Sequence, residues 1–281
     1  MAPQVWLVIG TSSGLGAEFV HAAVARGDKV IATARNVDRI AHLKDIGAAV
    51  MQLDVAASKD ELDLKAEEAI AIYGTIDVLV NNAGYTQFGT VEESSNDEWF
   101  KQFNTNVFGT LNTTRSFLPH LRSKKAGTIV FIGSMVAWDG VPTVGTYCAS
   151  KAAIHYAVES LSKELSPIGI KTLLVEPGTF RTELLNEPNC KSARTKFEDY
   201  RALTETVSSG FRTLNGTQIG DARKGAERVI DVVKGQNGTA GKEWPMSLLV
   251  GSDAVAVIRK KCEDTLRQVA EWEDFSKSTD L

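Results

Sequence analysis

The strongest constraint on the fold comes from the first 27 residues, where a short apolar run meets a cluster of glycines. Val5–Ile9 is continuously apolar and rich in β-branched residues, which favours a strand buried on both faces of a sheet. Gly10, Gly14 and Gly16 follow, and residues 17–26 have helical periodicity. This order is typical of a nucleotide site, because the glycines let the backbone approach a pyrophosphate and the helix N-terminus offers free N–H groups. The spacing is G-x-x-x-G-x-G rather than G-x-G-x-x-G, and a glycine-rich loop without a ligand is the alternative.

Apolar runs and helical patterns then alternate along the rest of the chain. Because no linker separates them, they predict an α/β fold with one doubly wound Rossmann domain over residues 1–281. We expect about seven parallel strands with helices on both faces. Further strands are predicted at 30–34, 49–53, 76–80, 127–132, 170–175 and 247–250, and helices at 58–73, 95–121, 146–165, 221–234 and 252–275.

Two segments depart from this regular pattern. Residues 183–215 lose their periodicity, and so long a connection in a compact domain is usually a lid or a substrate-binding loop. Asn106 lies inside the long helical stretch 95–121, where an asparagine is usually a surface residue but can also bend a helix by competing for backbone hydrogen bonds. The same stretch predicts Phe100 on its buried face.

Composition and charge exclude several classes of protein. The net charge is −4, so no global basic field attracts nucleic acid or an anionic membrane, and no apolar run approaches the ~20 residues of a membrane span. The N-terminus lacks the pattern of a signal peptide. The histidines show no metal-binding pairing, so no metal is expected, and the cysteines are spaced as free thiols of a reducing compartment. We therefore expect a soluble cytoplasmic protein; its cysteines are Cys148, Cys190 and Cys262.

Two positions near the second and third predicted strands bear on the choice of nucleotide. Arg35 follows the second strand, where the dinucleotide fold places the residue that contacts the ribose. A guanidinium suits a 2′-phosphate better than a 2′-hydroxyl, so we predict NADP rather than NAD; an exposed loop arginine is the alternative. Asp54 ends the third strand, and its carboxylate either accepts from the adenine amino group or caps the following helix.

Tyr147 and Lys151 are four residues apart in a predicted helix, so their side chains lie on one face, one turn apart. A phenol has an unperturbed pKa of about 10, and a nearby ammonium favours the phenolate. A lowering by roughly 3 units, at about 1.4 kcal/mol per unit, would favour the phenolate by roughly 4 kcal/mol. We therefore predict that Lys151 lowers the pKa of Tyr147 and makes it a usable proton donor and acceptor. An ordinary surface pair is the alternative, and the pair alone does not decide between them.

Polar residues also follow two further predicted strands. Ser134 follows the fifth predicted strand, at the edge of a doubly wound sheet where ligands bind, so it is placed to contact substrate. Asn82 follows the fourth strand, and bracing of the neighbouring loop is its favoured use over ligand contact.

Taken together, these motifs resemble the short-chain dehydrogenase/reductase family over essentially the whole chain. The glycine turn matches its cofactor loop, although Ile9 stands where a threonine commonly precedes the first glycine. Asn81-Asn82-Ala83-Gly84 matches its sheet-stabilising motif, and Ser134 lies thirteen residues before Tyr147, as the family expects. Within the family, Arg35 is typical of NADP(H)-preferring members. The runs Gly89-Thr90-Val91-Glu92-Glu93 and Gly251-Ser252-Asp253-Ala254 are similar to a 17β-hydroxysteroid-dehydrogenase-like and retinol-dehydrogenase-like branch.

The resemblance implies an enzyme that interconverts a ketone or aldehyde and an alcohol by hydride transfer with NADP(H). It implies that Tyr147 is the general acid/base, that Ser134 binds the carbonyl oxygen, that Lys151 assists Tyr147 and holds the nicotinamide ribose, and that Asn106 holds a water. The implied cofactor-binding residues are Gly10, Ser12, Ser13, Gly14, Leu15, Gly16, Arg35, Asp54, Val55, Asn82, Ala83, Gly84, Tyr147, Lys151, Pro177, Gly178 and Thr182.

Two other functions stay open. The same tetrad serves non-redox steps such as dehydration or isomerisation, and a non-catalytic dinucleotide-binding regulator would keep the fold alone. For the substrate, Trp138, Val141 and Val144 suggest a small, apolar carbonyl or alcohol compound bound near Phe88 and the 183–215 segment. Packing of these three residues beneath the lid is the alternative. Family members are mostly homodimers or homotetramers, so the resemblance implies contacts through the helices that carry Asn106 and Tyr147.

Overall fold

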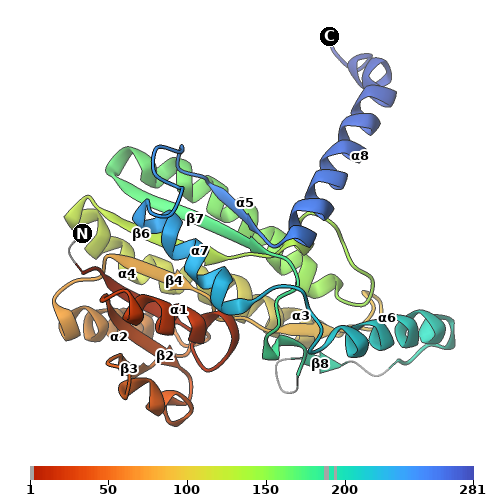
Figure 1. Cartoon of the computed structure of the whole chain (residues 1–281). Helices are drawn as coiled ribbons and strands as arrows, with labels where there is room; N and C mark the ends of the chain where they lie inside the picture. The colour runs from red at the N-terminus through yellow and green to blue at the C-terminus, as the bar shows by residue number, and fades with distance from the viewer. Residues whose placement is uncertain (1–2, 187–189, 193–194) are drawn as a thin grey trace.

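The computed structural model describes residues 3–186, 190–192 and 195–281 (Figure 1). A parallel sheet of seven strands forms its centre, in the order β3-β2-β1-β4-β6-β7-β9. The predicted fold class, an α/β fold with a doubly wound parallel sheet, is confirmed. The strands are β1 (Val5–Ile9), β2 (Lys29–Ala34), β3 (Ala49–Gln52), β4 (Val78–Asn81), β6 (Gly127–Ile132), β7 (Ile170–Pro177) and β9 (Ser247–Val250).

Both faces of the sheet are covered by helices, which is why β1 reads as a continuous apolar run. Leu7 and Ile9 pack into the core on one face and Trp6 and Val8 into the core on the other, all of them almost fully buried. The first core is closed by α2 (Lys59–Tyr73), α4 (Thr110–Lys124) and α5 (Gly145–Leu165). The second is closed by α1 (Gly14–Ala25), the 3₁₀ segment η1 (Val37–Lys44) and α7 (Ala222–Lys234).

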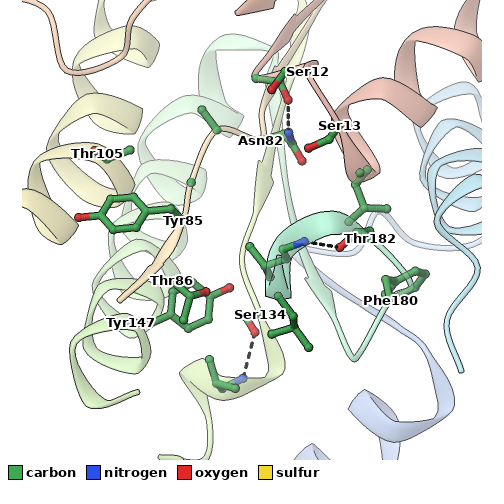
Figure 2. A pocket seen from close by; sticks show the side chains of 18 of the residues that line it. Ser12, Ser13, Asn82, Tyr85, Thr86, Thr105, Ser134, Tyr147, Phe180 and Thr182 are labelled. Atoms are coloured by element: carbon green, nitrogen blue, oxygen red, sulfur yellow. Dashed lines mark hydrogen bonds between the residues drawn. The ribbon is translucent and has the colours of Figure 1, made fainter. Parts of the chain in front are cut away.

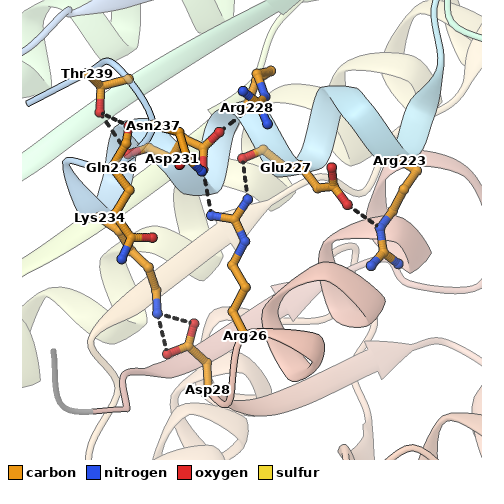
Figure 3. A network of polar contacts seen from close by, with 10 residues as sticks. All are labelled: Arg26, Asp28, Arg223, Glu227, Arg228, Asp231, Lys234, Gln236, Asn237 and Thr239. Atoms are coloured by element: carbon orange, nitrogen blue, oxygen red, sulfur yellow. Dashed lines mark hydrogen bonds and ion pairs between the residues drawn. The ribbon is translucent and has the colours of Figure 1, made fainter.

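Helices α1 and α7 are also joined by ion pairs (Figure 3). The carboxylate of Asp231, almost fully buried, binds Arg26 Nη1 at 2.7 Å and Arg228 Nε at 3.1 Å. Lys234, whose side chain is 7% exposed, binds the buried carboxylate of Asp28 at 2.6 Å. These contacts connect the loop after α1 to the end of α7, a segment about 200 residues away in sequence.

The long helix predicted over residues 95–121 is interrupted in the structure. It consists of α3 (Asn96–Phe103), a π-helical turn η2 (Asn104–Gly109) and α4. A π-turn inserts one residue into the helical repeat and rotates everything beyond it, so a single periodic face does not continue through the stretch. The prediction that Phe100 is buried is wrong, because this side chain is 70% exposed.

The 183–215 segment, for which the sequence predicted an irregular loop, contains regular structure. Its elements are the 3₁₀ turns η5 (Glu183–Leu185) and η6 (Glu198–Tyr200), strand β8 (Cys190–Ser192) and helix α6 (Arg201–Leu214). Strand β8 pairs with β5 (Thr86–Phe88). Residues 187–189 and 193–194 of this segment lie outside the described part of the chain. Buried Glu93 anchors the segment, because its carboxylate accepts from the backbone N–H groups of Lys196 and Phe197 at 2.5 and 3.0 Å.

The chain ends in α8 (Ser252–Lys277), which leaves the body of the molecule (Figure 1). Within the described residues, no helix combines the length and apolarity that crossing a bilayer requires.

Candidate active site

A cavity of about 660 Å³ lies at the carboxyl ends of the central strands. This is the edge at which doubly wound sheets bind their ligands. Most of the predicted cofactor residues line it: Gly10, Ser12, Ser13, Gly14, Leu15, Arg35, Asp54, Val55, Asn82, Ala83, Gly84, Tyr147, Gly178 and Thr182. Ser134 also lines the cavity. Four predicted site residues do not line it: Gly16, Asn106, Lys151 and Pro177.

The glycine turn between β1 and α1 is packed too closely for side chains. A Cβ on Gly16 would lie 2.1 Å from the carbonyl oxygen of Gly10, and Gly10 itself has φ +82° with Ala83 against it. Asn82 Nδ2 donates to Gly10 O at 2.7 Å, so its amide braces the turn as predicted. These contacts hold the first turn of α1 open toward the cavity.

The opposite wall of the cavity is formed by the segment after β7. A Cβ on Gly14 would meet the side chain of Thr182 at 3.2 Å, so the two predicted cofactor loops touch. Thr182 Oγ1 accepts from Leu184 N at 3.3 Å (Figure 2). Asp253, from the first turn of α8, accepts from Thr179 N at 2.7 Å and fills the space beside Gly178. Sequence reasoning missed this role of Asp253, because 74 residues separate it from Thr179.

Arg35 and Asp54 lie at the far end of the cavity, and both are exposed. The backbone of Arg35 is held by Gln52 Nε2, which donates to Arg35 O at 3.0 Å. Asp54 Oδ1 accepts from Ala56 N at 3.0 Å, so the carboxylate closes its own turn rather than capping α2. That helix begins with a capping box between Ser58 and Glu61.

Tyr147 stands in the first turn of α5 and faces the cavity together with Ser134 (Figure 2). The side chains of Ser134 and Thr86 lie close enough to its phenol to lower the pKa of that group. Ser134 Oγ in turn accepts from Val136 N at 3.3 Å, which fixes the serine rotamer. Thr86, buried in β5, was missed by the sequence analysis, because the short strand that carries it has no periodic signal.

Lys151 lies one turn further along α5 and is 7% exposed. Its ammonium donates to Ile132 O at 2.6 Å, and Nζ lies 5.6 Å from the centroid of the Tyr147 ring. The cation therefore faces the ring and the end of β6, and its close partner is a backbone carbonyl.

The predicted direction of the Tyr147 pKa shift is wrong for this structure. Burial raises the pKa of Tyr147 to about 12, and the hydrogen bonds from Ser134 and Thr86 only partly offset this. Burial also lowers the pKa of Lys151 to about 8. The physical reason is shared, because a low-dielectric environment disfavours both the phenolate and the ammonium. At neutral pH Tyr147 is therefore a protonated acid.

Asn106 stands in the π-turn η2, and both polar atoms of its side chain have hydrogen-bond partners. Its Oδ1 accepts from Tyr85 N at 3.2 Å. Its Nδ2 donates to Tyr85 O at 3.1 Å and to Ser150 Oγ at 3.2 Å. The side chain thus ties the segment after β4 to α5, and the break in the helix places it there.

The end of the cavity beside Tyr147 is apolar. Phe88, Val144 and Cys148 form a small core there, and Phe211 of α6 packs edge-on against Phe88 with ring centroids 4.8 Å apart. Val136, Val141, Leu184, Leu185 and Leu214 complete this wall. The segment around Trp138 contributes Met135, Val136 and Val141 to the cavity wall, as predicted. Trp138 itself is not part of the wall, and its indole N–H donates to Glu176 Oε1 at 2.8 Å.

Glu176, which the sequence analysis did not single out, binds three site-bearing elements together. It is fully buried next to Pro177. Its carboxylate accepts from Trp138 in the Ser134 loop and pairs with His155 Nδ1 at 2.9 Å, and Ser247 of β9 donates to its second oxygen. The hydrogen bond that His155 makes to the Glu176 carboxylate raises the pKa of His155. No cluster of histidine, cysteine or acidic residues in the described ranges could hold a metal ion.

A glycine turn and a tyrosine–serine pair at the carboxyl edge of a parallel sheet define a doubly wound, dinucleotide-type domain. The family model of the short chain dehydrogenases matches residues 4–192. The oxidoreductase BOA17 of Botryotinia fuckeliana is 30% identical over 277 residues, which cover 97% of this chain and 98% of that protein.

Solved structures agree with this assignment. A short-chain dehydrogenase from Streptomyces avermitilis superposes with a TM-score of 0.88 at 35% identity, over all of both chains. A short-chain dehydrogenase/reductase from Burkholderia phymatum in complex with NAD has a TM-score of 0.81 over 95% of each chain; at 23% identity this similarity shows the fold alone. The chain belongs to the short-chain dehydrogenase/reductase family, and it is an oxidoreductase of that family.

Proposed function

We propose that this protein is an NADP(H)-dependent oxidoreductase that interconverts a ketone or aldehyde and an alcohol, with Tyr147 as the general acid/base. The observation that carries the proposal is that the hydroxyl groups of Tyr147 and Ser134 and the glycine turn all face one cavity. The glycine turn fits a dinucleotide, because it has no side chains in the way and lies at the N-terminus of α1. When bound, NADPH supplies the hydride.

In the proposed mechanism, Ser134 orients the substrate carbonyl and Tyr147 gives its proton to the carbonyl oxygen. Thr86, the second hydroxyl group on the phenol, helps to keep it aimed at that oxygen. Lys151, whose ammonium lies 5.6 Å from the centroid of the Tyr147 ring, stabilises negative charge that develops on Tyr147. Asn106 Oδ1 accepts one hydrogen bond, from Tyr85 N, and its second lone pair holds a water that links Lys151 to solvent. A raised pKa keeps the phenol protonated, which favours reduction over oxidation near neutral pH.

The apolar wall around Phe88 and Phe211 supports an uncharged, apolar substrate. Helix α6 carries part of this wall, so we propose that residues 183–215 act as the substrate-binding lid. Exposed Phe100, Phe108 and Tyr156 support a homo-oligomer built through the elements that carry Asn106 and Tyr147. Free Cys148 and Cys262 support a cytoplasmic location.

Tyr147→Phe tests the chemistry. A positioned general acid contributes about 10²–10⁴ in rate, so kcat for NADPH-dependent reduction should fall by a factor in that range. The assay follows nicotinamide absorbance over a panel of ketones and aldehydes. Tyr156→Phe is the control, because this tyrosine lies on the same helix but is 68% exposed. Near wild-type turnover of Tyr147→Phe would refute the assignment, and product formation without NADPH oxidation would indicate a non-redox reaction.

Arg35→Ala tests the cofactor preference. Hydrogen bonds to a charged group contribute about 1.5–3 kcal/mol, so the ratio of KM for NADPH to KM for NADH should rise roughly tenfold or more. Lys44→Ala, an exposed cation at the far end of η1, serves as the control. An unchanged ratio in Arg35→Ala contradicts the NADP preference.

A further inference from the structure

The C-terminal helix α8 is attached to the body through its N-terminal part. Asp253 binds Thr179, and Ala254 and Ile258 are buried. From residue 259 to Lys277 the helix projects from the body (Figure 1), and Lys261 near the start of this part pairs with Asp139 at 3.4 Å. At 1.5 Å per residue this part is roughly 28 Å long.

This projecting part carries a continuous apolar stripe. Cys262, Leu266, Val269 and Trp272 follow one another at intervals of three or four residues, so they share one face of the helix. Leu266, Val269 and Trp272 are 69%, 58% and 54% exposed. Helices in proteins owe most of their stability to the packing of an amphipathic face, so a helix of this length needs a partner for the stripe.

The charges along the same part of α8 are divided between its two halves. Residues 259–267 have a net side-chain charge of +2, and residues 268–277 a net charge of −2. Two copies of the helix placed antiparallel bring each basic half against an acidic half, whereas a parallel pair brings like charges together. The stripe and the charges are therefore complementary to a second copy of the same helix.

We propose that α8 pairs with α8 of a second copy of this chain, antiparallel and with Leu266 and Val269 at the centre of the contact. Helices that lie on anionic membranes carry lysine and arginine along their polar face. The distal half of α8 is acidic, which favours a protein partner over a lipid surface. This contact is separate from the proposed contact through α3 and α5, and it does not depend on the reaction catalysed.

Leu266→Glu/Val269→Glu tests the contact. The full-length variant should have at most half the wild-type molar mass by size exclusion with light scattering, and circular dichroism should confirm that it is folded. Gln268→Glu/Thr279→Glu adds the same charge away from the centre of the stripe and should keep the wild-type mass. A stripe variant with the wild-type mass overturns the proposal. If, in addition, the wild-type protein sediments with vesicles of phosphatidylcholine and phosphatidylserine and the stripe variant does not, the stripe binds lipid and not a second helix.

Charge reversal tests the orientation. Arg259→Glu/Lys260→Glu should weaken association, and Glu273→Lys/Asp274→Lys should do the same, because each places like charges opposite one another. All four substitutions in one chain exchange the two halves and should restore the wild-type mass. If the fourfold variant associates as weakly as either double variant, the antiparallel pairing is wrong.

Discussion

Lys151 and Lys234 are both buried lysines on helices, and they have opposite surroundings. Lys234 on α7 binds a buried carboxylate, Asp28, at 2.6 Å. Lys151 on α5 donates to a backbone carbonyl, Ile132 O, also at 2.6 Å. Burial lowers the pKa of Lys151 to about 8. A buried cation with a matched anion stabilises the fold, whereas one whose close partner is a neutral carbonyl keeps its charge available for chemistry.

The different surroundings of the two lysines correspond to two regions of the molecule, the contact between α1 and α7 and the cavity wall around Tyr147. The ion pairs between α1 and α7 lie on the outside of the Rossmann core and join distant parts of the chain (Figure 3). The groups around Tyr147 lie on the cavity wall, where hydroxyl groups and a carbonyl oxygen take the place of counter-ions. Functional sites commonly depart from the rule of full pairing, and the rest of the fold supplies the stability.

The largest expected effect is that of Lys151→Met on turnover. Without the cation, developing charge on Tyr147 is not stabilised, so kcat should fall by about 10²–10⁴, the range for loss of a proton-transfer group. The melting temperature should stay the same or rise, because an apolar side chain replaces a buried ammonium that has no carboxylate partner. Steady-state kinetics measures kcat and calorimetry measures the melting temperature, both on the same preparation. A large loss of stability would show that Lys151 is a structural residue like Lys234.

Lys234→Met should have the opposite pair of effects. Removal of one partner of a buried ion pair costs about 3–5 kcal/mol, which lowers the folding equilibrium constant by roughly 10²–10⁴-fold, while kcat per folded molecule stays the same. Urea denaturation measures the change. Asp28→Asn/Lys234→Met should recover most of the loss, and Arg223→Gln, which breaks a partly exposed pair with Glu227, should cost about 0.5 kcal/mol or less. A change in kcat in Lys234→Met would show that the ion pairs of α7 also contribute to catalysis, contrary to the proposed division between the two regions.

The smallest effect is a pH dependence that separates activity from stability. Because Lys151 loses its proton with a pKa of about 8, the rate of reduction should fall about tenfold from pH 7 to pH 9, while Tyr147 stays protonated. Stability should move the other way, because between pH 8 and 10.5 the unfolded chain binds more protons at this lysine than the folded chain does. Above pH 10 the raised pKa of Tyr147 reverses this trend. A flat pH–rate profile, or one unchanged in Lys151→Arg, argues against the assignment to Lys151.

Much of the fold was predictable because its signals are local. The run Val5–Ile9, the following glycines and the capping serines Ser58 and Ser95 each specify their own few residues. Tyr147 and Ser134 were predicted from their places after strands and in a helix, and the structure brings them to one cavity. The sequence indicated a possible bend at Asn106 but not a π-turn. The change of helical register depends on the contacts of the Asn106 side chain with Tyr85 and Ser150.

The sequence by itself determined the order of strands, turns and helices, the close-packed glycine turn and the residue types available for chemistry. Periodicity and turn chemistry act over a few residues, so they can be read along the chain. Only the tertiary structure decided the protonation of Tyr147, the carbonyl partner of Lys151, the junction at Glu176 and the position of α6, which Glu93 anchors. Each of these depends on burial or on a partner from a distant segment, and neither is encoded in local sequence.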